Sequence, residues 1–480
     1  MSLTNDQVTE LAREAVRKMF ADHGPDFKFP ADVIWQNTPA GVQIPSTARP
    51  HQPKRLMKEG LLEKTGAMAK ALSEARNGSS TAEYRFGPSL VSRMPPETPL
   101  PLANLTRASD LLIRLQSKIE SEGYAFSVAE LANFYLAMMV SPLVILSGIS
   151  GTGKSLLPRQ FAKHAGSEFK LVPVQPQWSD NSDLFGYVPT LSPTEFIEGA
   201  LIPSLVKAKE NPSTLTIALL DEMNLAPVEH YFSDFLSIAE TRRREGASIV
   251  TDLLPIELPK VPTEPPNKFS HLANLGLPHN LRVIGTANMD ETTHSFSPKV
   301  LDRAFTIEFD DPDLTSFANY TATGEEDFSK LADLIVDARN PLSIQEAYQN
   351  SQALFDEVAG LLQEIQNILS PAGIKFGYRT RDAVLLYLHF WKQLGLEDIV
   401  SADAALDFCL LQKVLPKISG SGEQLADALS ALTDWLKNQR TSDGDGQPLT
   451  FVGPFTRSQE KSERMASLLD VDGATHYWGT

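Results

Sequence analysis

Residues 148–155 have the sequence Gly148-Ile149-Ser150-Gly151-Thr152-Gly153-Lys154-Ser155, which completes the pattern G-x-x-x-x-G-K-[ST]. The apolar run 143–146 precedes it, and residues 156–165 after it have a helical pattern. In this setting glycines let successive backbone N–H groups and the helix N-terminus face a phosphate. Lys154 can then reach the β- and γ-phosphates, and the Ser155 hydroxyl can bind Mg²⁺. The sequence therefore predicts a loop that binds a nucleoside triphosphate, with contacts from Gly148, Ser150, Gly151, Thr152, Gly153, Lys154 and Ser155.

Two later apolar runs end in polar residues. Residues 215–220 lead into Asp221 and Glu222, and residues 280–287 lead into Asn288. Parallel strands expose their carboxyl ends at one edge of a sheet, so these side chains are expected near the loop. Asp221 would hold Mg²⁺ through water, Glu222 would polarise the attacking water, and Asn288 would contact that water or the γ-phosphate. Asn288 could instead be an ordinary turn residue.

Composition limits the class of protein. The chain has 480 residues, of which 42% are apolar and 21% charged, as in ordinary globular proteins. Its single cysteine, Cys409, excludes an intrachain disulfide and suits a reducing compartment. No Cys and His spacing indicates a metal cluster, and no apolar run approaches membrane-spanning length. We expect a cytoplasmic protein with no membrane segment.

Charge is distributed unevenly along the chain. Residues 1–104 carry 13 Lys and Arg against 11 Asp and Glu, whereas the whole chain has a net charge of −17. An acidic body argues against nucleic-acid binding over the whole surface, but leaves room for a local basic face near the N-terminus.

A basic segment follows an amphipathic helical pattern at residues 5–22. Residues 41–76 contain seven basic and three acidic residues, and a glycine-containing turn then leads into the strand-like segment 81–86. A helix, a basic helix and a hairpin in this order suggest a winged-helix domain that binds duplex DNA. The alternative is a helical adaptor whose basic face is only solvated. The candidate DNA contacts are Arg49, Lys54, Arg55 and Lys58.

The predicted fold class is α/β, with a P-loop NTPase core built on a parallel sheet. Residues 1–92 are predicted to form a small α+β, winged-helix-like domain, followed by a proline-rich linker at 93–104. Residues 105–312 would form the α/β nucleotide-binding subdomain, and 313–440 an all-helical lid. Residues 441–480 show little periodicity and are predicted to be a C-terminal tail.

The loop, the Asp221-Glu222 strand and the Asn288 strand together resemble the AAA+ ATPases over residues 105–435. The resemblance implies a homo-oligomeric, hexameric ring in which Asn288 is sensor 1. Arg303 would be the arginine finger that enters the neighbouring subunit's site, although it could also be a surface charge or a partner of Asp302. Arg379 resembles sensor 2, which reaches the nucleotide from the lid, and Arg381 is the competing candidate.

Further matches narrow the resemblance. Residues 175–180 and 183–187 look like the helix-2 insert of the McrB, MoxR and midasin group, with 189–198 as its hairpin and 199–202 as its return. Four segments look most like McrB restriction subunits: 221–224, 232–236, 285–290 and 410–417. McrB proteins carry Met-Asn-Thr-Ala-Asp after the third strand, a signature of GTP use. Here Met289 and Asp290 follow Asn288, and Leu225 replaces the usual arginine. ATP is therefore the expected nucleotide, with GTP possible.

Three functions remain open. The first is the motor or switch subunit of a McrB-like, DNA-targeting restriction or defence system. Because the terminal regions contain no nuclease constellation, cutting would need a separate McrC-like nuclease subunit. The second is a MoxR-like remodelling chaperone whose N-terminal region docks a protein client. The third is a nucleotide-binding scaffold that hydrolyses slowly, against which Glu222, Asn288 and Arg303 argue.

Overall fold

The computed structural model describes residues 107–478, apart from 247, 260–268, 290–292, 311–325 and 441–448. Before residue 107 it describes residues 8–9, 11–13, 15–16, 19, 28–30, 33–36, 52–58, 61–70 and 80–86. The chain divides into two compact units, Met1–Leu105 and Thr106–Thr480. Arg49 and the predicted linker at 93–104 lie outside the described residues.

The second unit is built on a five-stranded sheet with the order β10-β4-β9-β6-β5. All neighbouring strands are parallel. The strands are β4 (Leu143–Gly148), β5 (Glu168–Pro173), β6 (Thr216–Asp221), β9 (Leu281–Asn288) and β10 (Phe305–Glu308). β4, β6 and β9 are the three predicted apolar runs, which are continuous because both faces of a parallel sheet are covered. The predicted α/β core is confirmed.

Alternate residues of each strand enter different cores. In β4, Val144 and Leu146 join the core shared with α5, α6 and α7, whereas Leu143 and Ile145 join the core on the other face. The first three helices are α5 (Ala108–Ser121), α6 (Val128–Val140) and α7 (Leu156–His164). The opposite face is covered by α9 (Ile202–Glu210), α10 (Val228–Tyr231), α11 (Ser233–Ala239) and α12 (Pro298–Leu301).

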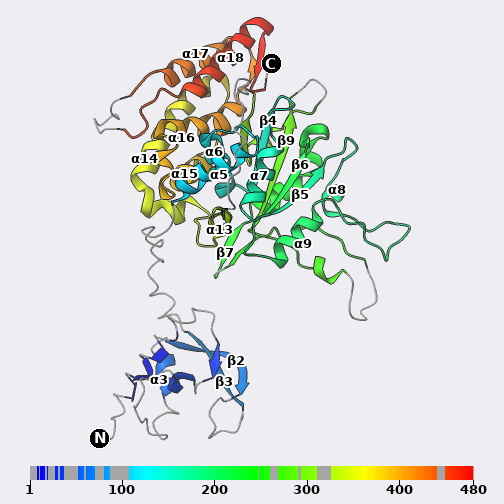
Figure 1. The fold of residues 1–480 in the computed structure, drawn as a ribbon, viewed down its shortest axis with the longest axis vertical. Coiled ribbons are helices and arrows are strands. Elements are labelled where there is room, and N and C mark those ends of the chain that lie inside the picture. The colour runs from blue at the N-terminus through cyan, green and yellow to red at the C-terminus, as the bar shows by residue number, and fades with distance from the viewer. Residues whose placement is uncertain are drawn as a thin grey trace. The chain divides into compact units, whose positions relative to one another are not determined.

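The C-terminal region is helical and packs beside the sheet (Figure 1). Tyr387 of α15 donates a hydrogen bond from its hydroxyl to Oδ1 of Asn133 in α6, at 2.8 Å, so this region shares a core with the sheet. Its helices are α13 (Ser329–Val336), α14 (Ile344–Leu369), α15 (Tyr378–Gln393), α16 (Ala402–Cys409), a π-helical turn (Leu410–Val414), α17 (Glu423–Lys437) and α18 (Thr456–Asp472).

The prediction of a C-terminal tail is wrong for residues 449–478. α18 lies against α17 (Figure 1), and β12 (Ala474–His476) pairs with β11 (Ser419–Ser421), so the lid also contains a small sheet. Two of the four buried α18 residues are Ser458 and Ser462, and only Met465 and Leu469 are apolar. A helix that buries serines has a weak amphipathic pattern, which is why the sequence did not reveal it.

Two segments extend from the sheet. The predicted helix-2 insert contains α8 (Ser182–Phe185) and an antiparallel bridge between Tyr187 and Ile197. The second segment, after α11, forms the hairpin β7 (Arg243–Glu245) and β8 (Ser248–Val250). No described helix is both long and apolar enough to cross a membrane.

The described part of the N-terminal unit follows the predicted order. Helical residues between 8 and 19 precede β1 (Phe29–Pro30), α2 (Val33–Gln36), α3 (Gln52–Lys58), β2 (Leu62–Lys70) and β3 (Ser80–Phe86). The three strands form an antiparallel sheet with the order β1-β3-β2. Its core contains Val16, Ile34, Leu56, Leu62 and Tyr84. The predicted basic helix is α3, which carries Lys54, Arg55 and Lys58.

Candidate active site

The phosphate loop leaves the carboxyl end of β4 and enters α7. Gly148, Gly151 and Gly153 have φ values of 138°, 87° and 91°, which L side chains rarely adopt. Lys154 is buried and donates to the carbonyl oxygens of Gly148 at 2.8 Å and Ile149 at 2.6 Å. Burial lowers the pKa of Lys154, and the nearby carboxylates oppose that shift. The lysine is thus folded along a loop whose shape suits phosphate.

Two hydroxyl groups converge on the carboxylate at the end of β6. Ser155 Oγ and Thr286 Oγ1 each donate to Asp221 Oδ1 at 2.8 Å. Hydroxyl and carboxylate oxygens are the ligands that Mg²⁺ prefers, and Mg²⁺ usually takes only one or two protein ligands beside substrate phosphates. Within the described residues no group of three His, Cys, Asp or Glu side chains could hold a metal alone. Ser155 and Asp221 therefore fit a nucleotide-bound Mg²⁺.

Glu222 and Asn288 meet beside this pair. Asn288 Nδ2 donates to Glu222 Oε1 at 3.1 Å, and the N–H of Glu222 donates to Thr286 Oγ1 at 2.9 Å. Glu222 has φ 54° and ψ 52°, a left-handed conformation that costs a non-glycine residue about 1–3 kcal/mol and is concentrated at functional sites. Thr286 was not predicted as a site residue, although it lies two residues before Asn288 on the same face of β9.

Asp310 is a site residue that the sequence analysis missed. Ile149, inside the phosphate loop, donates its N–H to Asp310 Oδ1 at 3.1 Å. A carboxylate of the same chain thus accepts a hydrogen bond from a backbone N–H of the loop. The sequence offered one indication, because Asp310 comes just after the apolar strand β10, as Asp221 comes at the end of β6. The pairing of β10 with β4, which brings Asp310 to the loop, was not predicted.

The C-terminal residues also reach this edge of the sheet. Trp478 Nε1 donates to Ser147 Oγ at 3.2 Å, one residue before the loop, and its ring lies 5.7 Å from that of Phe296. In α18, Lys461 pairs with Glu308 at 2.5 Å. The segment predicted to be a tail therefore contacts the strands on which the loop is built.

Arg303 and Arg379 lie together, away from the loop of their own chain. Arg303 Nε and Arg379 Nη2 each lie 2.7 Å from Glu240 Oε1, and Arg379 Nη1 donates to Asp302 Oδ2 at 2.8 Å. Asp302 lies a few residues before the amino-terminal end of β10. The carboxyl end of β10, Glu308, pairs with Ser147 beside the loop. The length of β10 thus separates both arginines from the loop.

Arg379 was predicted to reach the nucleotide from the lid; in this structure it lies at the start of α15, over the Asp302 segment and away from the loop of its own chain. Burial tends to raise the pKa of Asp302, but hydrogen bonds from Lys417 and Arg379 lower it to about 2. Lys417 donates to Asp302 Oδ1 at 2.6 Å. The competing candidate, Arg381, pairs with Asp382 at 2.7 Å and lies over the ring of Tyr378.

Residues 143–304 match the family described as AAA domain (dynein-related subfamily). The chain carries an AAA ATPase domain. It is an ATP-hydrolysing enzyme of the AAA+ class, as predicted. The match runs from the first residue of β4 to the residue before β10, and therefore includes the loop, Asp221, Glu222, Asn288 and Arg303.

Residues 329–474 match a domain of unknown function (DUF8727), which extends from α13 into β12. No curated protein matches the chain. Among solved structures, a protein from Cytophaga hutchinsonii, described as a proposed ATPase, is 14% identical. The alignment covers 64% of this chain and 89% of that protein, with a TM-score of 0.39. A score of this size does not establish a shared function.

Proposed function

We propose that this AAA+ ATPase is a McrB-like motor or switch subunit that forms a hexameric ring and hydrolyses ATP in preference to GTP. It would couple hydrolysis to duplex DNA held by its N-terminal unit, and a separate nuclease subunit would cut. The observation that carries the ring is the placement of Arg303 and Arg379 at the end of β10 remote from their own loop.

A guanidinium group stabilises the charge that develops during phosphoryl transfer only if it reaches the transferred group. In an isolated chain both arginines lie beyond the amino-terminal end of β10, whereas the loop lies beside its carboxyl end. A neighbouring subunit's loop placed against the surface around Glu240 would meet both arginines. Glu240 binds the two together, so they would enter the neighbouring site as one unit.

The residues at the loop have separable roles in hydrolysis. Lys154, which now donates to two carbonyl oxygens, would donate to the β- and γ-phosphates. Ser155 and Asp221 would hold Mg²⁺, which neutralises phosphate charge when it is bound. Glu222 would accept a hydrogen bond from the attacking water at its carboxylate, while Asn288 fixes one oxygen of that carboxylate.

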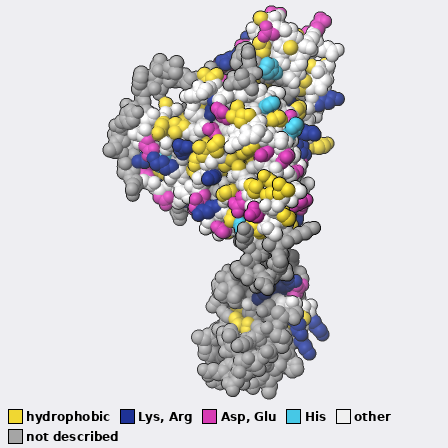
Figure 2. Space-filling model, turned by 90° about the vertical axis from the view of Figure 1, so that its right-hand side faces the viewer, with side chains coloured by type: hydrophobic (Ala, Val, Ile, Leu, Met, Phe, Trp, Pro, Cys, Tyr) yellow, Lys and Arg dark blue, Asp and Glu magenta, His cyan; other side chains and the backbone are white. Residues whose placement is uncertain are grey.

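The N-terminal unit supports the DNA part of the proposal. Lys54 and Lys58 are exposed and lie four residues apart, on one face of α3. Arg55 is also exposed, but its Nη1 donates to Thr9 Oγ1 at 2.9 Å, which joins α3 to the first helix. Lys and Arg side chains are visible on the described surface of this unit (Figure 2). We therefore expect phosphate contacts chiefly from Lys54 and Lys58.

The alternative is a MoxR-like chaperone, which one observation favours. Large apolar side chains are exposed on the two segments that extend from the sheet: Tyr187 and Ile197 at 46%, Leu253 at 54% and Leu191 at 97%. Figure 2 shows hydrophobic side chains in several patches on the side of the second unit that faces the viewer. Exposed apolar residues of this kind suit a protein client.

The deciding experiment measures hydrolysis of ATP and GTP by the full chain with and without duplex DNA, together with DNA affinity at several salt concentrations. Each lost phosphate contact should reduce the salt slope by about 0.9, so Lys54→Gln with Lys58→Gln should reduce it by about 1.8 for all sequences alike. Lys437→Gln, an exposed charge on α17, is the matched control. If the chain binds DNA without salt dependence, or does not bind DNA at all, the chaperone becomes the better-supported function.

A further inference from the structure

The turn that carries Arg303 joins the end of α12 to the start of β10. α12 ends at Leu301 and β10 begins at Phe305. The last carbonyl oxygens of a helix have no partner within the helix and must find one elsewhere. A glycine turn often satisfies them, but residues 302–304 include no glycine. The turn therefore depends on groups from other parts of the chain.

Lys413, in the π-helical turn of the lid, supplies these contacts. Its Nζ donates to three backbone carbonyl oxygens, at 3.3, 3.0 and 2.6 Å, which belong to Leu301, Asp302 and Ala304. An ammonium group has three donors, so Lys413 uses all of them on this one turn. The backbone on both sides of Arg303 is thus held by a single side chain.

The charge of this lysine is buried against a cost. Lys413 is 1% exposed. Burial, together with the nearby charge of Lys417, lowers the pKa of Lys413 to about 7, although the carboxylate of Asp302 opposes the shift. Apolar residues of similar volume often replace buried charged groups without loss of stability. A requirement for stability alone therefore does not explain a charge at this position.

The side chain of the same turn is held by the same segment of the lid. Asp302 Oδ1 accepts from Lys417 Nζ at 2.6 Å. Lys417 ends the 3₁₀ turn (Leu415–Lys417) that directly follows the π-helical turn. π-helical turns occur frequently at functional sites. Lys413 and Lys417 together fix both the backbone and the side chain of the residue that precedes Arg303.

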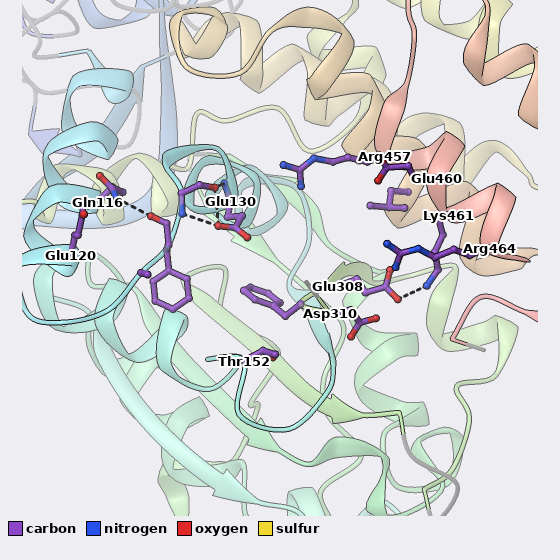
Figure 3. A pocket seen from close by; sticks show the side chains of 15 residues that line it. Gln116, Glu120, Glu130, Thr152, Glu308, Asp310, Arg457, Glu460, Lys461 and Arg464 are labelled. Carbon is purple, nitrogen blue, oxygen red and sulfur yellow. Dashed lines mark hydrogen bonds and ion pairs between the residues drawn. The ribbon is translucent and has the colours of Figure 1, made fainter. Parts of the chain in front are cut away.

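The opposite end of β10 is held separately. Lys461 of α18 pairs with Glu308 beside the phosphate loop, as Figure 3 shows. Glu308 lies opposite Ser147 of β4, so this contact belongs to the loop end of the strand. A change at Lys413 should therefore displace Arg303 without displacing the loop of its own chain.

We infer that Lys413 is a positioning residue for Arg303, and that Lys417 assists it through Asp302. The two lysines fix the turn so that the Arg303 guanidinium is presented to phosphates bound by a neighbouring subunit. The inference rests on the proposed function, in which Arg303 acts between the subunits of a ring. It gives the lid of one chain a part in hydrolysis at the site of the next chain.

The test measures kcat and the dissociation constant of ATP with Mg²⁺ for variants of the full chain. Lys413→Met keeps a long, unbranched side chain but leaves three carbonyl oxygens without their donor. It should lower kcat about a hundredfold, as a misplacement of about 1 Å can do, while ATP affinity stays the same. Lys417→Gln loses one hydrogen bond to a charged group and should lower kcat about tenfold. Lys417→Arg should recover part of that loss.

Gln412→Met is the matched control. Gln412 is the neighbour of Lys413 and is also 1% exposed, but it donates to Asn133 of α6 and not to the Arg303 turn. Asn133 Oδ1 keeps its hydrogen bond from Tyr387 in this variant. Gln412→Met should leave kcat and ATP affinity at wild-type values. An equal loss of kcat in Gln412→Met and Lys413→Met would overturn the inference, because damage to the lid alone would then account for it.

Mixing variants separates positioning of Arg303 from a defect in the chain's own site. A Lys413→Met chain keeps its loop and Glu222 intact, so mixing it with Glu222→Gln, whose Arg303 is correctly placed, should restore part of the activity. Mixing Lys413→Met with Arg303→Ala should restore none, because both chains lack the same function. The reverse pattern would place Lys413 in the site of its own chain and overturn the inference.

The mixture of Arg303→Ala with Glu222→Gln separates the two levels of the argument. If this pair regains activity but Lys413→Met does not behave like Arg303→Ala, only the inference fails. If this pair regains none, the action of Arg303 between subunits fails and the inference fails with it. Should thermal unfolding show that Lys413→Met does not fold, Lys417→Gln takes its place in the same mixtures, with the same outcomes.

Discussion

Gly148→Ala tests whether the start of the phosphate loop is as crowded as the structure implies. Gly148 ends β4 with a φ of 138°. A Cβ atom there would lie 2.5 Å from the carbonyl oxygen of Phe309 and 2.7 Å from Asp310 Oδ1. The backbone of Phe309 cannot easily retreat, because its N–H donates to the carbonyl of Ser147 at 2.8 Å.

Two costs add at this position. Forcing alanine into the positive-φ region costs about 1–3 kcal/mol. Overlap with a backbone that cannot move costs a further 1–3 kcal/mol, roughly the range for overpacking. The free energy of unfolding should therefore fall by about 2–6 kcal/mol. Gly151→Ala is the matched control, because Gly151 has a φ of 87° but no atom within 4 Å of its added Cβ. For Gly151→Ala the free energy of unfolding should fall only by the cost of the positive φ, about 1–3 kcal/mol.

Urea-induced unfolding without nucleotide, followed by tryptophan fluorescence, measures both variants. Leaving nucleotide out is essential, since ATP binding would add its own stabilisation to whichever variant still binds. Gly148→Ala should unfold at a clearly lower urea concentration than Gly151→Ala. Equal midpoints would refute the reasoning, because they would mean that the close approach of β10 and Asp310 to Gly148 does not exist in solution.

Two further predictions concern the ring and the pH dependence of stability. Arg303→Ala and Glu222→Gln should each bind ATP but hydrolyse it poorly, and mixing them should restore part of the activity, because a mixed ring contains intact interfaces; unrescued mixtures would argue against a finger acting between subunits. Burial, with Asp310 nearby, raises the pKa of Glu308 from 4.5 to about 7 against the opposing pull of Lys461. The folded chain then holds a proton that the unfolded chain releases, so stability falls as pH rises through this window, by about 3 kcal/mol in total. Glu308→Gln should flatten the unfolding free energy between pH 5 and pH 8, and an unchanged slope would contradict the assignment.

The nucleotide edge of the sheet could be predicted because its signals are local. A buried parallel strand needs an uninterrupted apolar run, and its carboxyl end is the only part that meets a ligand. Asp221, Glu222 and Asn288 each follow such a run directly, and the structure brings Asp221 to Ser155 and Asn288 to Glu222. For these three residues the local sequence pattern was therefore enough to predict their place in the fold.

The lid could not be predicted to the same depth, because its functional residues depend on packing between distant segments. Arg379 lies two residues after Gly377, in a segment that resembles sensor 2. The position of its side chain, however, is set by Asp302, 77 residues earlier, and by Glu240. α18 buries two serines, so its amphipathic pattern is faint, and Asp310 becomes a site residue only through the pairing of β10 with β4. The local sequence pattern therefore indicates these positions only weakly.

The helical region contacts β10 at both ends of the strand, which should restrict movement between the sheet and the lid. At one end Lys461 pairs with Glu308 beside the loop. At the other end Lys413, which is buried, donates to the carbonyl oxygens of Asp302 at 3.0 Å and Ala304 at 2.6 Å. A hinge between sheet and lid would have to break both sets of contacts as well as the shared core. We therefore expect the loop and the Arg303 segment of one chain to move as a single body, so that in the proposed ring ATP bound at the loop would change the neighbouring site through rotation of the whole subunit.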